Sequence, residues 1–183
     1  MAFSLTPVST RGPIGLVVVA VLAAAALLAL PGSTAGGPRA GTDWAAGAFS
    51  ADAAIALIAA TEHSRDEAGD ASLVVDPALT AVARWRSRDM VERAYFSHDI
   101  PDVGTVFHQL DTDGYCYELA GENIGWDTDA DEAAPAAIHQ MFLDSLDHRR
   151  NILETRWDAI GVGAFKAADG RKMWTVLFAD RCG

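Results

Sequence analysis

Two histidines and one glutamate stand out because each lies in a short polar motif within otherwise apolar sequence. His98 closes the motif Phe-Ser-His, Glu122 lies in Gly-Glu-Asn-Ile, and His148 lies in Ser-Leu-Asp-His-Arg. Two imidazoles and a carboxylate are the groups from which a divalent-metal site or an acid/base site is built. We therefore predict that His98, Glu122 and His148 share one water-accessible cleft, where they bind a ligand or a metal ion such as zinc or calcium.

Each of these residues also has a structural explanation. A histidine just after a helix can hydrogen-bond a neighbouring carbonyl, which would account for His98. Glu122 lies between glycines and can organise a loop by accepting backbone N–H bonds, because a buried carboxylate needs such partners or a positive charge. His148 fits an exposed helical position. No metalloprotease HExxH, hydrolase GxSxG or phosphate-binding P-loop motif is present, so no catalytic residue is predicted.

Helices are predicted to carry most of these motifs. Asp76 followed by Pro77 is a strong helix start, since proline is favoured at the first helical position. The stretch from Tyr115 to Asp129 is rich in glycine and turn residues and is predicted to be a long ordered loop, with or without a strand. The periodicity predicts helices over about 50–68, 77–96, 103–113 and 131–143, and a further helical turn that begins at residue 145.

In the C-terminal part, apolar residues recur with the two-residue repeat of β-strands and not with the helical repeat. Apolar residues alternate over 160–165 and again over 174–178, and Ala168-Asp169-Gly170-Arg171 between them is typical of a hairpin turn. The helices come first, the hairpin comes last, and strands and helices do not alternate. This order predicts an α+β fold in which helices cover an antiparallel sheet.

The N-terminal part reads as a targeting segment. After Arg11 comes an uncharged apolar run over 14–30, followed by the small residues Ser33-Thr34-Ala35. This pattern predicts that residues 1–35 are either a secretory signal peptide or an uncleaved membrane anchor. Residues 36–50 are predicted to be a flexible tether and residues 51–183 a single domain. Either alternative places the domain outside the cytoplasm, secreted or membrane-anchored.

The net charge limits the possible binding partners, and the cysteine content bears on the cellular compartment. The net charge of −11 argues against nucleic acid and anionic lipid as partners, so membrane contact is expected only through an uncleaved N-terminal segment. Cys116 and Cys182 are the only cysteines, and an even pair in an exported chain predicts a disulfide. Closing so long a loop would stabilise the fold by about 4 kcal/mol in the chain-entropy model.

The order of the motifs over roughly Ala51 to Cys182 resembles a bacterial member of the CAP superfamily, which includes cysteine-rich secretory proteins, venom antigens and plant pathogenesis-related proteins. The resemblance implies a three-layer α–β–α sandwich with a small antiparallel sheet. It also implies an open cleft lined by His98, Glu122 and His148. A second glutamate found in eukaryotic relatives has no clear counterpart, and Asp144 is a candidate for it only by its proximity to His148. Phe142 takes the place of a tryptophan common in bacterial relatives.

The leading functional hypothesis is a non-enzymatic extracellular binding module. Its cleft would hold a divalent cation or a small amphipathic ligand, and its partner would be a small ligand, a lipid or a component of the cell envelope. A metal-dependent hydrolase of peptides or cell wall is the first alternative, because the same residue set could activate water. The second alternative is a purely structural polar cluster that organises the loops.

Overall fold

The computed structural model describes residues 44–182. The predicted signal peptide or anchor, and residues 36–43 of the predicted tether, lie outside the described residues. Within residues 44–182, no helix is both long enough and apolar enough to cross a bilayer.

Four strands form one sheet in the order β1-β3-β4-β2. β4 pairs antiparallel with both β2 and β3, whereas the short β1 pairs parallel with β3. The predicted hairpin is therefore confirmed as β3 and β4. The predicted loop over 115–129 is instead mostly a long edge strand, β2. The bounds are Val74–Val75 for β1, Tyr117–Asp127 for β2, Ala159–Lys166 for β3 and Lys172–Arg181 for β4.

Two helices, α1 and α2, begin at the capping residues that the sequence predicts. The Ser50 side chain accepts a hydrogen bond from the Ala53 N–H, and the Asp76 carboxylate accepts from the first amides of the next helix, which begins at Pro77. These caps satisfy backbone donors that the first helical turn leaves free. The bounds are Ala51–Ala68 for α1, Pro77–Glu92 for α2, Val106–Thr112 for α3, Ala134–Asp144 for α4 and Leu146–Ile152 for α5.

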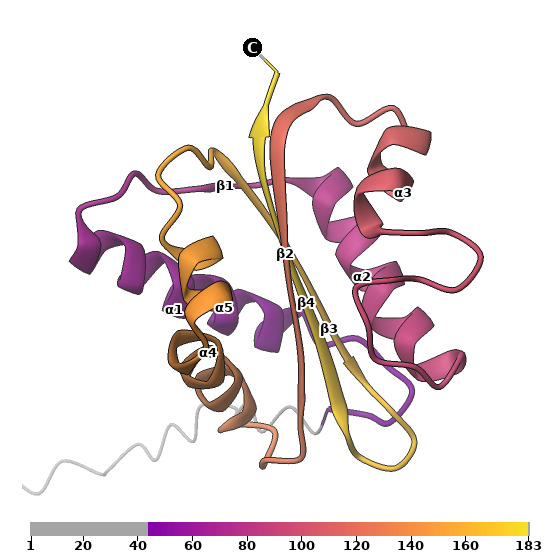
Figure 1. The fold of residues 1–183 in the computed structure, drawn as a ribbon. Coiled ribbons are helices and arrows are strands. Elements are labelled where there is room, and N and C mark those ends of the chain that lie inside the picture. The colour runs from indigo at the N-terminus through magenta and orange to yellow at the C-terminus, as the bar shows by residue number, and fades with distance from the viewer. Residues whose placement is uncertain (1–43, 183) are drawn as a thin grey trace, which may run out of the picture. The chain divides into compact units, whose positions relative to one another are not determined.

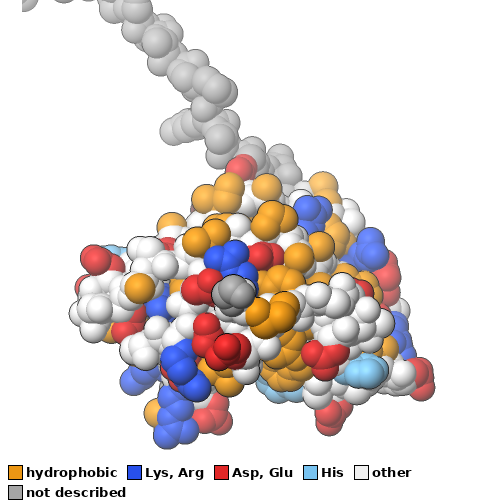
Figure 2. Space-filling model, turned by 90° about the horizontal axis from the view of Figure 1, so that it is seen from above, with side chains coloured by type: hydrophobic (Ala, Val, Ile, Leu, Met, Phe, Trp, Pro, Cys, Tyr) orange, Lys and Arg blue, Asp and Glu red, His pale blue; other side chains and the backbone are white. Residues whose placement is uncertain are grey.

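The helices form two layers, one on each face of the sheet. In Figure 1, α1, α4 and α5 cover one face and α2 and α3 cover the other. Each layer has its own apolar core, with Trp174 and Phe178 facing the first layer and Leu177 facing the second. This architecture is an α–β–α sandwich, and the predicted fold class is confirmed. The face of the molecule in Figure 2 carries interspersed acidic and basic side chains, so the net charge of −11 is not gathered there.

Two glycines in β3 allow α2 to lie directly on the sheet. A Cβ atom on Gly161 would lie 2.4 Å from the backbone carbon of Leu79, and one on Gly163 would lie 2.2 Å from the carbonyl oxygen of Ala83. Both contacts are with helix backbone, which cannot rotate away as a side chain can. The close approach of α2 to β3 therefore depends on the absence of side chains at these two positions.

Replacing Gly163 with alanine tests this packing. Because the new methyl group overlaps the backbone of α2, Gly163→Ala should lower the free energy of unfolding by about 3 kcal/mol. Urea denaturation followed by circular dichroism measures the loss. The control is Gly170→Ala in the hairpin turn, where φ is +87° and nothing lies within 4 Å of the new Cβ. That change should cost only about 1 kcal/mol, through backbone strain. An equal or smaller loss for Gly163→Ala would show that α2 does not need this contact.

Residues 44–50 correct the prediction of a flexible tether. Trp44 is buried and packs edge-on against Trp174, with the ring centroids 5.4 Å apart. Its backbone N–H donates to Asp131, and Phe49 forms an isolated antiparallel bridge with Phe165. The glycine- and alanine-rich composition led to the tether prediction, but the two aromatic side chains have apolar area to bury. This stretch is part of the folded domain.

The disulfide between Cys116 and Cys182 is confirmed, with the two Cα atoms 5.4 Å apart. The backbone N–H of Cys182 also donates to the carbonyl of Cys116 at 3.3 Å. The bridge joins the chain just before β2 to the chain just after β4. It therefore holds together one end of the strand pair that carries Glu122.

Candidate functional site

A cavity of about 600 Å³ lies at the edge strand β2, between the two helical layers. His98 and His148 both line it, and Glu122 lies next to His98. The structure thus brings the three residues singled out in the sequence to one part of the molecule. The lining comes from the segment after α2, from β2, from α4 and from the start of α5, and consists of Phe96, Ser97, His98, Ile124, Gly125, Trp126, Met141, Ser145 and His148.

Glu122 is held between a histidine and an arginine. Its Oε2 accepts a hydrogen bond from His98 Nδ1 at 2.5 Å, and its Oε1 accepts from Arg86 Nε at 3.0 Å. The side chains of Arg86 and Glu122 are 0% and 3% exposed, whereas that of His98 is 56% exposed. The arrangement is a buried ion pair that presents one imidazole to the cavity.

Arg86 is the functional residue that the sequence analysis missed. Its other nitrogens donate to the hydroxyl of Tyr95, at 2.7 Å, and to the carbonyl of Ser97. The signal was present in the sequence, because Arg86 lies seven residues after Leu79 and four before Met90, on the buried stripe of α2. A charged residue on that stripe needs a buried partner, and Glu122 is that partner.

The chain turns sharply after α2 to bring His98 back toward β2. Ala94 has a left-handed backbone with φ of +55°, and the Tyr95 N–H donates to the carbonyl of Met90. The Tyr95 hydroxyl then donates to Asp89 at 2.5 Å. Because Tyr95 also accepts from Arg86, the turn is fixed to the same network as the ion pair.

Two asparagines fix His148 on the other side of the cavity. Asn123 Nδ2 donates to the carbonyl of His148 at 3.0 Å. Asn151 Nδ2 donates to the carbonyl of Glu122 at 3.1 Å and to Asn123 Oδ1 at 2.8 Å. These bonds clamp α5 to β2, which explains why asparagines accompany Glu122 and His148 in the sequence.

The two histidines have opposite pKa shifts. The hydrogen bond to Glu122 raises the pKa of His98 above its ordinary value, against a smaller lowering by burial. Burial lowers the pKa of His148, and the nearby His98 lowers it further. Near neutral pH, His148 is therefore an uncharged imidazole with a lone pair on one nitrogen, and His98 is the more readily protonated of the two histidines.

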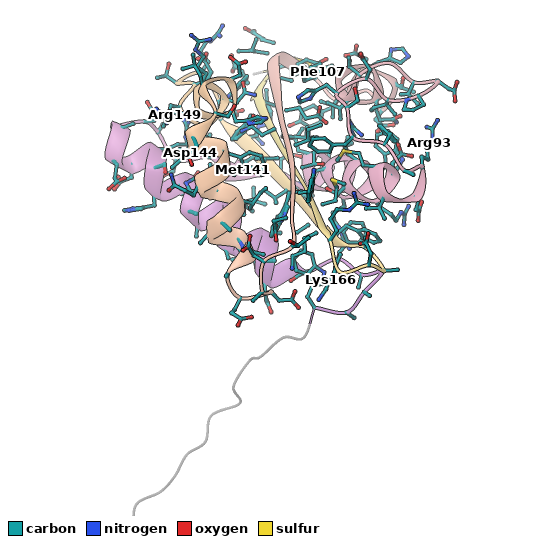
Figure 3. The ribbon with its side chains drawn as sticks, turned by 60° about the horizontal axis from the view of Figure 1, so that its bottom comes forward. Arg93, Phe107, Met141, Asp144, Arg149 and Lys166 are labelled. Carbon is teal, nitrogen blue, oxygen red and sulfur yellow. A yellow bond between two sulfur atoms is a disulfide. The ribbon has the colours of Figure 1, made fainter. Side chains whose placement is uncertain are left out.

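Much of the lining is apolar and unusually exposed. Phe96, Trp126 and Met141 are 48%, 45% and 43% exposed, and all three line the cavity. Figure 3 labels Met141 on α4, in the helical layer opposite Arg93, which follows the end of α2. The sequence analysis did not predict this lining. Phe96 and Trp126 lie within two residues of the motif positions His98 and Ile124. This proximity was the sequence signal that could have indicated them as lining residues.

The residues present do not form the predicted three-ligand metal site. Both oxygens of Glu122 are taken by Arg86 and His98, and no group of three or more metal-ligating side chains occurs among the described residues. Asp144 is exposed, accepts from Gln140 and does not line the cavity. These two hydrogen bonds, together with the 3% exposure of its side chain, orient Glu122 toward His98 and Arg86. Metal binding by His98, Glu122 and His148 stays a prediction.

Comparison with known proteins identifies the family of this chain. The model of the cysteine-rich secretory protein family, CAP, matches residues 58–178, which is more than half of the chain. The chain belongs to the cysteine-rich secretory protein family. The matched CAP region contains every lining residue of the cavity and the Arg86–Glu122 pair. The resemblance drawn from the motifs is confirmed.

Two relatives from Bacillus subtilis share this CAP region. The uncharacterized protein YkwD is 31% identical over 125 residues, which is 68% of this chain and 46% of that protein. The uncharacterized membrane protein YlbC is 32% identical over 121 residues, which is 66% of this chain and 32% of that protein. This chain therefore spans less than half the length of either relative.

Two solved structures of other proteins have a similar fold. An extracellular protein of Bacillus anthracis that contains an SCP domain is 30% identical, with a TM-score of 0.61 over 71% of this chain and 41% of that one. An outer surface protein of Borrelia burgdorferi, 19% identical, has a TM-score of 0.64 over 74% of this chain and 99% of that one. The second match shows the fold alone.

The contact between Glu122 and His98 predicts how the histidines titrate. His98 should titrate above the ordinary histidine pKa and His148 below it. In Glu122→Gln the pKa of His98 should fall, because the hydrogen bond to a carboxylate is lost and Arg86 then repels the imidazolium ion. Nuclear magnetic resonance of the imidazole C–H signals measures both values in the native protein and in the variant. Glu118→Gln, at an exposed position of the same strand, is the control. An unchanged His98 pKa in Glu122→Gln would contradict the assignment.

Proposed function

We propose that this CAP domain is an extracytoplasmic binding module whose cavity at β2 holds a small amphipathic ligand. The main observation that supports this proposal is that three large, exposed apolar side chains and two histidines line the same cavity. The apolar side chains would contact the hydrocarbon part of the ligand. The histidines would contact its polar part.

The size and the surface of the cavity support this proposal. A volume of about 600 Å³ falls within the roughly 300–1,000 Å³ typical of small-molecule sites. Phe96, Trp126 and Met141 each leave nearly half of their surface in water, which is unfavourable unless something covers them. A ligand seated between them would remove apolar surface from water on both sides of the contact.

The polar groups of the cavity support an amphipathic ligand over a purely apolar one. Ser145 and His148 lie at the α5 side, and His98 lies at the α2 side, held in place by Glu122. No carboxylate lines the cavity among the described residues, although the whole chain carries a net charge of −11. The imidazoles are therefore free to bond hydroxyl or other acceptor groups of a ligand.

The location outside the cytoplasm rests on three supports. The sequence pattern over residues 1–35 predicts export, and the related Bacillus anthracis protein is extracellular. A disulfide between Cys116 and Cys182 fits an oxidising compartment.

Calorimetric titration with sub-micellar octyl glucoside, an uncharged amphipath, tests the proposal. We expect binding by the native chain and about fivefold weaker binding by Trp126→Ala, which removes an apolar wall of the cavity. Val74→Ala is the matched control, because Val74 is 54% exposed and lies in β1, away from this cavity. Equal weakening by the two substitutions, or no binding by the native chain, would overturn the proposal.

Divalent-cation binding is the second candidate for the same cavity. His148 favours it, because its lowered pKa leaves the imidazole uncharged near neutral pH, with a lone pair for a cation. Since Glu122 is already paired, the available donors are the two imidazoles. Imidazole nitrogen suits zinc, whereas calcium prefers oxygen ligands.

Zinc titration distinguishes this candidate from the first. Cation binding predicts heat on addition of zinc, loss of that heat in His98→Ala and in His148→Ala, and no heat with calcium. His108→Ala, at an exposed position on α3, is the control and should leave the zinc heat unchanged. Absence of zinc binding by the native chain would remove the cation candidate and leave the amphipath proposal standing.

A further inference from the structure

A second cavity, of about 240 Å³, lies at the opposite edge of the sheet. β1 pairs with β3 only at Ala159 and Ile160, and the Ser50 N–H donates to the carbonyl of Ala164 further along. Between these two contacts no described strand covers β3 at Val162. The cavity occupies this gap, with α1 on one side and α2 on the other.

The walls of this second cavity are almost entirely apolar. Ile55 and Val75 are 63% and 51% exposed at its rim. The lining consists of Phe49, Ser50, Ala51, Ala54, Ile55, Ile58, Val75, Thr80, Arg84, Val162 and Ala164. The hydroxyl oxygen of Ser50 caps α1 by accepting from the Ala53 N–H.

Two polar groups of the lining, from Arg84 and Thr80, form no side-chain hydrogen bond or ion pair among the described residues. Arg84 lies over the ring of Phe49, with its guanidinium carbon 4.4 Å from the ring centroid, and no described carboxylate is within ion-pair distance of it. The hydroxyl oxygen of Thr80 is buried and makes no hydrogen bond. Because this oxygen is shielded from solvent, Arg84 is the polar group that a molecule in the cavity would meet.

We propose that this second cavity binds a small carboxylic acid with an apolar body. Its body would lie against Ile58, Val162 and the rim residues, and its carboxylate would pair with Arg84 at the mouth, beside Thr80. Charge decides between an acid and an amine, because the lining contains a cation and no carboxylate. Size limits the ligand, since the volume is below the roughly 300 Å³ at which sites for drug-sized molecules begin.

This site is independent of the function proposed for the cavity at β2. The two cavities share no lining residue. Failure of the octyl glucoside experiment therefore leaves this second proposal intact, and the reverse also holds.

Amide chemical shifts of the full chain, measured during titration with octanoate, test the proposal. Octan-1-ol keeps the apolar body without the charge, and acetate keeps the charge without the body. We expect octanoate to shift the amides of Ala54, Thr80 and Arg84, octan-1-ol to bind about fivefold more weakly, as expected for loss of one exposed ion pair, and acetate not to bind. Octanoate shifts confined to Trp126 and Met141, or equal affinity for octanoate and octan-1-ol, would overturn the proposal.

Substitution of the arginine supplies the second readout. Arg84→Gln should weaken octanoate about fivefold and leave octan-1-ol unchanged. Arg88→Gln is the matched control, because Arg88 lies one turn further along α2, is exposed and pairs with Glu92. Both positions are on the solvent side of the helix, so both variants should fold. An equal effect of the two substitutions on octanoate binding would count against Arg84 as the carboxylate partner.

Discussion

The buried ion pair between Arg86 and Glu122 is the interaction on which the site depends. It joins α2 to the edge strand β2. Both charges are out of water, and removal of either one would leave the other unpaired, at a cost of about 3–5 kcal/mol. Arg86 also binds Tyr95 and the carbonyl of Ser97, so the pair fixes the turn that carries His98. The position of the histidine thus follows from the burial of the charges behind it.

The second constraint on the site is how closely the two helical layers approach the sheet. Glycines in β3 let α2 approach the sheet closely enough for Arg86 to reach β2. On the other face, Gly125 lies under α4, where a Cβ atom would come within 2.6 Å of Ile138. Asn123 and Asn151 then hold α5 against β2. Because both layers are fixed relative to one strand, the two histidines line a single cavity.

The sequence was informative where local patterns determine structure. Caps and periodicity predicted the helices, alternation predicted the β3–β4 hairpin, and cysteine count predicted the disulfide. The segment that contains β2 was predicted as an ordered loop, with a strand left open, because Gly121 and Gly125 resemble turn signals. In the structure, a side chain at either glycine would clash with a packed neighbour, which is Trp157 for Gly121 and α4 for Gly125. Such packing contacts join residues far apart in the chain, and a single sequence does not contain them as a local pattern.

The candidate site was predictable in part for the same reason. His98, Glu122 and His148 were visible because polar residues stand out in apolar sequence. Arg86 was hidden among other arginines of α2, and only its place on the buried stripe distinguished it. The apolar lining was not predicted, because an exposed tryptophan and a core tryptophan have the same sequence signal. Residues 44–50 were assigned to a tether from composition, although Trp44 and Phe49 carry enough apolar area to join the core.

The topology explains why the cavities lie where they do. With strand order β1-β3-β4-β2, the two faces of the sheet are covered by helices, but its two edges are not. Helices packed on opposite faces diverge beyond the last strand, and side chains from both layers then meet across a gap. One such gap lies at β2 and contains the two histidines, and the other lies at β3 beside Val162. The sandwich itself therefore produces two edge cavities, and the residues that line each one determine its chemistry.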